Sequence, residues 1–365
     1  MAQRHLDPTG PRAERVTGDA LAGYLRAQAT EFLRALRLHR ETGGTAANGS
    51  GPHGTGSPAD PVDAARALRR AVRRISGSLH TFRPLLDSDW SESMRPELAW
   101  LSGTLAMEHA YSARLERLLL ALNRLSGAVF PAQTTGATAS AARPGGSGPP
   151  APPAAPDRGN LTVGAAKAGA LLERQLTLAR TRAHSTALQA LGSSRFHAVA
   201  DNIAVLASEV PLVPDATTTG LHPHTVAAQE RLTDAVAALP LVTAGHPYNA
   251  EALIHGLAPD PAPHPQDTPW HQVRLLLRLH RYALEALQGT NAPVDVRLLA
   301  AGQALDRHRD ASEAAAAAAQ AARTPRIAPA TAYALGVLHA DQRHEVEAAR
   351  FAFHQSWQKQ PVGTP

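Results

Sequence analysis

The stretch from Pro61 to Leu86 constrains the fold most, because it predicts a helix whose faces need different surroundings. Its apolar side chains recur at steps of three and four residues, which places them on one seam of an amphipathic helix. This seam contains Leu68, Val72, Ile75, Leu79 and Phe82. Such a seam requires an apolar core, so the pattern predicts that other helices pack against it.

Between residues 66 and 74 the remaining faces of the same predicted helix carry arginine and no carboxylate. The arginines are Arg66, Arg69, Arg70, Arg73 and Arg74. The nearest acidic residues are Asp63 before them and Asp87 after them. A basic helix face is most often a solvated surface, but such surfaces usually mix Glu with Lys or Arg. Because this face has one sign and contains only Arg, it favours forked, weakly hydrated contacts with phosphate groups.

Composition predicts an all-α fold. Among the 365 residues alanine is abundant and only 4% are aromatic, a balance that favours helices. The absence of cysteine excludes disulfides and thiolate metal ligands. The net charge of +5 and pI of about 10.0 are mild for this length, so an anionic partner is inferred from clustering and not from the total. No apolar run is long enough to cross a membrane, and a cytoplasmic location is expected.

The order of apolar periods and breaks predicts two helical-bundle halves. Residues 1–16 form a leader that does not resemble a signal peptide, residues 17–212 the first half, 213–357 the second and 358–365 a tail. Low-complexity, disordered inserts are expected at about 41–59 and 127–160. Helices are expected at about 20–42, 61–86, 95–125, 161–191, 195–206, 225–239, 249–256, 270–287, 294–322 and 330–357.

A second basic helix, residues 270–287, repeats the spacing of the first. The first set is Arg66, Arg69 and Arg73, and the second is His271, Arg274 and Arg278, extended by Arg281. This match indicates an internal duplication in which the two helices form the walls of one basic groove.

At these residues the chain resembles the CHAD family, the conserved histidine α-helical domain. Residues 79–86, LHTFRPLL, are similar to the first-half signature of the family. Residues 191–197 and 335–339 resemble a turn and a C-terminal segment of the family, and the resemblance extends over about 17–357. The second-half signature is matched by His271, Val273, Arg274, Arg278, Arg281 and Tyr282.

The resemblance implies two pseudo-symmetric four-helix bundles with a basic central groove that binds inorganic polyphosphate. A linear polyanion has no bases to read, so a track of cationic side chains and counterion release suffice for binding. Arg66 stands where the family has its first histidine, whereas Leu275 and Leu279 replace basic residues. The candidate contacts are Arg66, Arg69, Arg70, Arg73, Arg74, His80, Arg83, Arg182, His184, Arg195, His271, Arg274, Arg278, Arg281 and Tyr282.

No catalytic residue, metal or cofactor is predicted. The sequence contains no Gly-rich phosphate loop, nucleophile elbow or HExxH motif, and its 18 histidines show no ligand spacing. Glu345 and Glu347 resemble the start of the ExExK motif of CYTH-type phosphatases, but Ala349 occupies the position of its lysine. Carboxylates that can pair with arginines are Glu108, Glu116, Glu173 and Glu285.

Two functions remain open at this point. The first is a non-catalytic polyphosphate-binding module, whose ligand would bring the protein to polyphosphate granules. The second is a nucleic-acid-binding or scaffolding helical protein that uses the same basic face. The sequence favours the first, because it lacks surface aromatic residues near the basic stretches for stacking on bases and any recognised reading helix.

Overall fold

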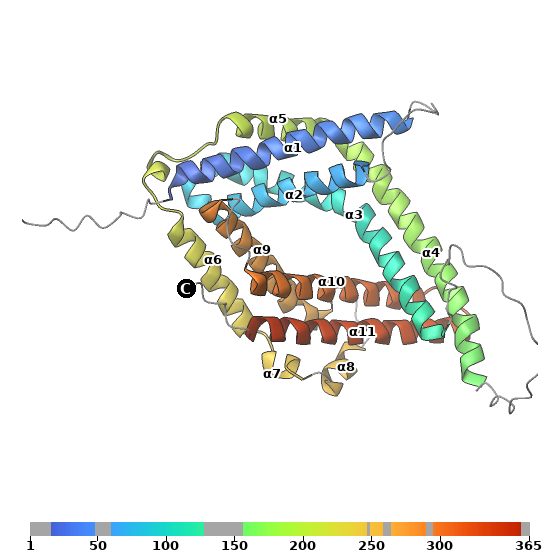
Figure 1. Cartoon of the computed structure of the whole chain (residues 1–365). Coiled ribbons are helices and arrows are strands. Elements are labelled where there is room, and N and C mark those ends of the chain that lie inside the picture. The colour runs from blue at the N-terminus through green and yellow to red at the C-terminus, as the bar shows by residue number, and fades with distance from the viewer. Residues whose placement is uncertain are drawn as a thin grey trace, which may run out of the picture. The chain divides into compact units, whose positions relative to one another are not determined.

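The chain folds as an all-α protein, as the sequence predicts (Figure 1). The computed structural model describes residues 16–47, 60–127, 156–246, 249–257, 264–289 and 295–358, and within these ranges there are eleven α helices and no strand. The helices are α1 (Gly18–Ala47), α2 (Asp60–Thr81), α3 (Ser88–Ser126), α4 (Pro156–Leu191), α5 (Ser194–Ser208), α6 (His222–Ala237), α7 (Leu241–Ala244), α8 (Ala250–Gly256), α9 (Thr268–Gln288), α10 (Val296–Ala322) and α11 (Pro329–Gln358).

Helix α2 ends at Thr81 and not at residue 86, where the sequence predicts its end, because the 3-10 turn Arg83–Leu85 with Pro84 follows it. Three further helix ends differ from the sequence-based expectation by five or more residues. Helix α1 continues to Ala47, past the glycines at which it was expected to end, and Arg37 and Glu41 form an ion pair of 2.7 Å near that end. Helix α3 begins at Ser88, because the Asp87 carboxylate accepts the backbone N–H of Trp90 at 2.8 Å and caps the first turn. Helix α4 begins at Pro156, a residue type suited to a first turn. The rest of both predicted inserts, and nearly all of the leader and the tail, lie outside the described residues.

The residues group into two compact units that interleave along the chain. Unit 1 comprises Met1–Met107, His184–Leu239 and Gln272–Leu299, and unit 2 comprises Glu108–Ala183, Pro240–His271 and Ala300–Pro365. Helices α3, α4, α9 and α10 therefore contribute residues to both units. The predicted division into two helical-bundle halves, residues 17–212 and 213–357, stays a prediction.

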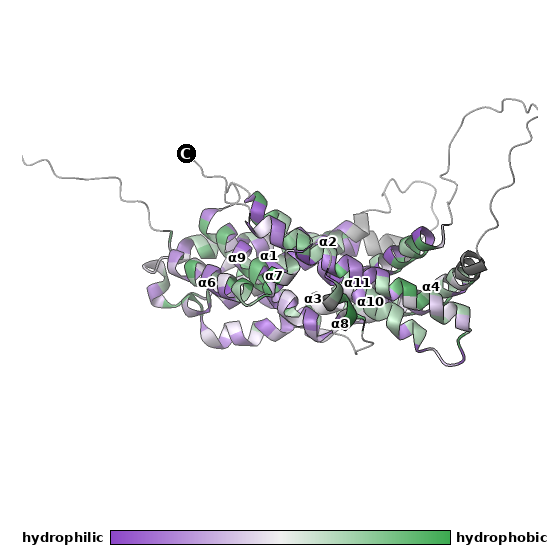
Figure 2. Cartoon of the chain, turned by 90° about the horizontal axis from the view of Figure 1, so that it is seen from below, coloured by the Kyte–Doolittle hydropathy of each residue, from purple (hydrophilic) through white to green (hydrophobic). Residues whose placement is uncertain are grey.

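The core of unit 1 buries the apolar seam of α2. Helix α1 packs against α2 and α5. The seam residues of α2, together with Phe82 just beyond its end, are at most 1% exposed, which confirms the amphipathic pattern. After α2, the 3-10 turn Arg83–Leu85 leads into an isolated bridge between Leu86 and Leu212. Polar and apolar residues occur along the same helices (Figure 2).

The core of unit 2 is built largely from small side chains. Ala314, Ala318 and Ala321 of α10 are fully buried beside leucines of α3, α4 and α11. A Cβ atom at Gly164 would lie 2.1 Å from the carbonyl oxygen of Ala330, so α4 and α11 meet at backbone distance there. The Ala-rich run therefore packs closely, as its lack of side-chain bulk requires. No helix in the described part of the chain is both long and apolar enough to span a membrane.

Candidate anion-binding site

Helix α2 and the part of α9 that belongs to unit 1 contact each other at Gly77. A Cβ atom at this position would lie 2.6 Å from Cδ2 of Tyr282 and 3.3 Å from Cδ2 of Leu279. Only a residue without a side chain permits this approach. The two helices that the sequence predicts as walls of one site are therefore direct neighbours within one unit.

An ion pair holds the same two helices together. Arg74 of α2 donates to both carboxylate oxygens of Glu285 on α9, at 2.7 and 3.3 Å, and Tyr24 of α1 donates to Glu285 at 3.1 Å. Burial and the Glu285 charge raise the pKa of Tyr24, so its hydroxyl stays protonated. Burial alone lowers the pKa of Arg74, but its bond to Glu285 outweighs burial and raises it. The Arg74 guanidinium also lies 5.7 Å from the ring centre of Tyr282, so both of these candidate contacts take part in helix packing.

The other arginines of the two helices are exposed or half-buried. Arg66 is exposed and its Nη1 lies 3.4 Å from Oδ1 of Asp63, a weak ion pair on the same helix. Arg70 is exposed and Arg281 is half-buried, and neither makes a hydrogen bond or ion pair with any described residue. The basic face is defined as Arg66, Arg69, Arg70, Arg73, Arg274, Arg278 and Arg281.

Charge on these helices is strongly unbalanced. Together α2 and residues 272–288 of α9 carry eight arginines and three carboxylates, of which Glu285 is already paired with Arg74. Like charges on neighbouring helices repel one another, so an anion that lay across them would stabilise the arrangement.

A second cluster of cations lies at the C-terminal end of α2. Nη2 of Arg95 is 3.4 Å from Nδ1 of His80, and Arg83 and Arg95 share the carboxylate of Glu92, each at 2.9 Å. Burial and the charges of Arg95, Arg231 and Arg83 lower the pKa of His80 below its usual value. Sequence reasoning missed Arg95 and Arg231, because they come from α3 and α6 and share no spacing with the arginines of α2.

The remaining candidate contacts are distributed elsewhere. Arg195 of α5 donates to Glu97 at 2.7 and 3.1 Å, and its guanidinium lies 4.1 Å above the ring of Trp100. His184 is exposed on the part of α4 that belongs to unit 1. Arg182 and His271 belong to unit 2, where the His271 ring lies 5.4 Å from the ring of His308. The described residues contain no group of three or more His, Asp or Glu side chains suited to a metal ion.

Comparisons with known proteins agree with the resemblance seen in the sequence. Residues 53–319 match the CHAD domain, a family of binding domains known for polyphosphate binding. The solved structure of PptA from Streptomyces chartreusis is 67% identical, covers 94% of this chain and 100% of its own, and has a TM-score of 0.74. The CHAD domain from the plant Ricinus communis is 16% identical over 97% of this chain and 96% of its own, with a TM-score of 0.49. No curated protein matches the chain.

Proposed function

Because this chain belongs to the CHAD domain family, we propose that it binds inorganic polyphosphate through the basic face of α2 and α9. The binding is non-catalytic: the arginines hold successive phosphate groups of a linear chain in a groove, and no bond is made or broken. Such a module would also bring the protein to polyphosphate granules.

One observation carries this proposal: on two neighbouring helices of one unit, the arginines outnumber the carboxylates of the same helix segments by eight to three. The residues from Arg66 to Arg73 span seven positions of α2, or roughly 10 Å along its axis, a length that several phosphates of a linear chain can follow. Arg70 and Arg281 donate no hydrogen bond to any described residue, so all their N–H donors remain for a ligand. Guanidinium groups bind phosphate oxygens in a forked geometry.

The same basic face also suits nucleic acid, which is the alternative. Recognition of single strands depends on aromatic side chains that stack on the bases. On α2 and residues 272–288 of α9 the only aromatic ring apart from histidine is that of Tyr282, which packs against Gly77 and Arg74. The surface therefore offers charge without a stacking platform, which favours polyphosphate.

A titration separates the two ligands. Long-chain polyphosphate, tripolyphosphate, and single- and double-stranded DNA are compared at equal phosphate concentration and at two salt concentrations. We expect long-chain polyphosphate to bind most tightly of the four ligands. The double variant Arg69→Ala/Arg274→Ala should bind it at least about tenfold more weakly than the wild type, because fewer counterions are released on binding when phosphate contacts are lost.

The matched control is Arg34→Ala/Arg37→Ala, which removes the same charge from exposed arginines of α1 that pair with Glu31 and Glu41. This control should bind polyphosphate almost as the wild type does. Tighter binding of DNA, or equal losses in the two double variants, would reject the proposal.

A further inference from the structure

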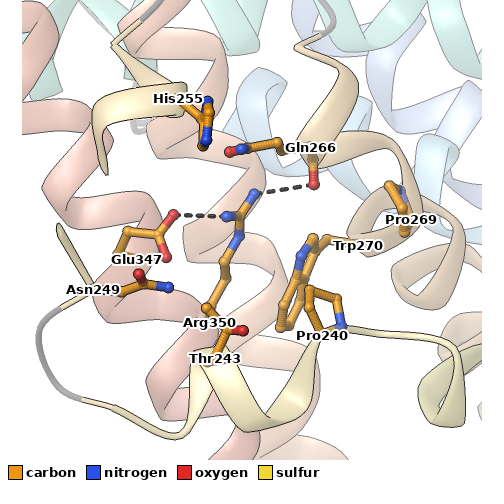
Figure 3. A pocket seen from close by; sticks show the side chains of 10 residues that line it. Pro240, Thr243, Asn249, His255, Gln266, Pro269, Trp270, Glu347 and Arg350 are labelled. Carbon is orange, nitrogen blue, oxygen red and sulfur yellow. Dashed lines mark hydrogen bonds and ion pairs between the residues drawn. The ribbon is translucent and has the colours of Figure 1, made fainter. Parts of the chain in front are cut away.

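Unit 2 contains a cavity that none of the candidate polyphosphate contacts lines. It has a volume of about 350 Å³ and lies among α7, α8, the start of α9 and α11 (Figure 3). Its walls are mainly apolar, with Pro240, Ala244, Pro269 and Trp270 among the lining residues. A mostly apolar cavity of this size with a few polar groups is typical of a site for a small molecule.

A buried ion network holds several residues that line this cavity in place. Asp267 is fully buried and accepts hydrogen bonds from Arg343 at 2.7 and 3.2 Å, from Arg350 at 2.7 Å and from Ser312. Arg350 also donates to the backbone oxygen of Gln266 at 3.1 Å, and its guanidinium lies 5.3 Å from the ring centre of Trp270. These contacts fix the positions of Gln266, Trp270 and Arg350, which all line the cavity.

The polar groups of the lining are incompletely used. Oε1 of Glu347 accepts from Nη1 of Arg350 at 2.6 Å, whereas Oε2 of Glu347 accepts no hydrogen bond from the described residues (Figure 3). Oε1 of Gln266 is buried and likewise has no partner there. Of the five N–H donors of Arg350, four are used, which leaves one on Nη1, beside Glu347. An unused donor beside unused acceptors is the complement of an amide group.

The carboxylates and guanidinium groups of the network around the cavity are equal in number. Glu347 and Asp267 are balanced by Arg350 and Arg343, and burial and the Arg350 charge keep the pKa of His308 low, so that its ring is neutral. A ligand with a net charge would therefore enter an apolar site without a counter-ion, which is unfavourable.

We propose that this cavity binds a small uncharged molecule that carries a carboxamide or lactam group on an apolar ring. Its N–H donates to Oε2 of Glu347, its carbonyl accepts the remaining Nη1–H of Arg350, and its ring packs among the prolines and Trp270. Glu347 thereby has a role in ligand binding although the sequence provides no catalytic motif around it. The proposal is independent of polyphosphate binding.

Three probes of nearly equal shape test the charge requirement. Benzamide, benzoate and benzamidine are neutral, anionic and cationic, and their binding to the full chain is measured by calorimetry and by saturation-transfer NMR. We expect benzamide to bind at least about tenfold more tightly than either ion, since an unpaired charge in such a site is penalised. Absence of benzamide binding, or tighter binding of an ion, would overturn the proposal.

Three variants locate the binding site of benzamide. Thr243→Trp places an indole at a lining residue that is exposed, and should abolish benzamide binding, whereas Val242→Trp adds the same indole at a neighbour that is 85% exposed and outside the lining, and should leave it unchanged. Glu347→Gln removes one negative charge beside Arg350, and should reverse the preference to benzoate.

An unchanged preference for benzamide in Glu347→Gln would show that Glu347 is not the acceptor, and would overturn the proposal. If circular dichroism shows that Glu347→Gln does not fold, the indole pair decides. Equal benzamide binding by Thr243→Trp and the wild type would contradict this location.

Discussion

The arginines near the cavity of unit 2 and those of the basic face of unit 1 differ in burial and in pairing. In unit 2 the side chains of Arg343 and Arg350 are 3% and 5% exposed and share the fully buried Asp267. In unit 1 Arg70 is exposed, and neither Arg70 nor Arg281 has an ion pair or hydrogen bond among the described residues. One residue type thus builds a structural network in one unit and an accessible basic surface in the other, and the carboxylates nearby decide which.

The physical reason lies in hydration. A buried guanidinium loses its water and must be compensated by an anion of the protein, whereas a hydrated one keeps its water until a ligand displaces it. Arg74 lies between these cases, because it is half-buried and Glu285 neutralises it. Arg74 therefore lies at the border between the basic surface and the core of unit 1.

The largest effect is expected from breaking the network of unit 2. Asp267→Ala leaves Arg343 and Arg350 without their shared anion and should lower the free energy of unfolding by about 3–5 kcal/mol. Denaturant unfolding measures this loss. Asp63→Ala, which removes an exposed carboxylate with a weak partner, is the control and should change stability by less than about 0.5 kcal/mol. A small loss in Asp267→Ala would mean that the buried network is not structural.

The pH dependence of this network follows from the same residue. Its arginine partners outweigh burial and hold the pKa of Asp267 well below its usual range. Because the folded pKa is lower than the unfolded value of about 4, the stabilisation is fully present above pH 4 and is lost as the pH falls towards the folded value. The difference in unfolding free energy between the wild type and Asp267→Asn should therefore be smaller at pH 2.5 than at pH 7.

A smaller effect is expected from separating α2 and α9. Gly77→Ala places a Cβ atom against Tyr282, so the helices must shift, and stability should fall by about 1–3 kcal/mol while polyphosphate binding weakens. Gly23→Ala on α1 is the control, since its Cβ meets nothing within 4 Å and better helix propensity should stabilise by up to about 1 kcal/mol. Thermal unfolding of both variants measures the contrast. Equal responses would contradict the close approach at Gly77.

The ion pair between Arg74 and Glu285 can be broken without removing the arginine. Glu285→Gln removes the charge that neutralises Arg74, and should tighten polyphosphate binding about two- to fivefold by adding one cation to the surface. Glu31→Gln on α1, next to the exposed Arg34, is the control and should have little effect. Weaker binding in Glu285→Gln would show that holding the helices together matters more than the added charge.

The last effect is a pH dependence of binding and concerns His80. In the protein without ligand, burial and the neighbouring arginines lower the pKa of His80. A bound polyanion would raise this pKa, so His80 would take up a proton when polyphosphate binds. Polyphosphate affinity should therefore rise, by less than about tenfold, as the pH falls from 8 to 5.5, and His80→Gln should reduce that rise. His222→Gln, an exposed histidine of α6, is the control. An identical pH profile in His80→Gln would exclude this role.

Much of the fold could be predicted because its signals are local. The period of Leu68, Val72 and Ile75 predicts a buried helix face, and that face is buried. The Asp267 network could not be predicted in the same way, since Asp267 lies in a Pro-rich segment and its partners are 45 to 83 positions further along the chain. The seven-residue spacing of Arg343 and Arg350 on one helix face was the only local signal.

Prediction of the candidate site from the sequence is limited in the same way. The repeated spacing of Arg69 and Arg274 predicts two basic helices, and the sequence contains that information directly. That Glu285 would neutralise Arg74, or that Arg95 and Arg231 would approach His80, depends on helix contacts across long sequence distances. Spacing reveals which residues share a face, but it does not reveal which face meets a carboxylate.

The salt dependence of polyphosphate binding tests the central claim most directly. Affinity for long-chain polyphosphate is measured between 50 and 300 mM salt for the wild type, Arg70→Ala/Arg281→Ala and Arg34→Ala/Arg37→Ala. If the basic face binds the ligand, the slope of log K against log salt should become shallower by roughly 1.4 in the first variant, about 0.7 per lost phosphate contact, and should stay unchanged in the second. Equal changes in both variants would mean that only overall charge matters, and would contradict the account.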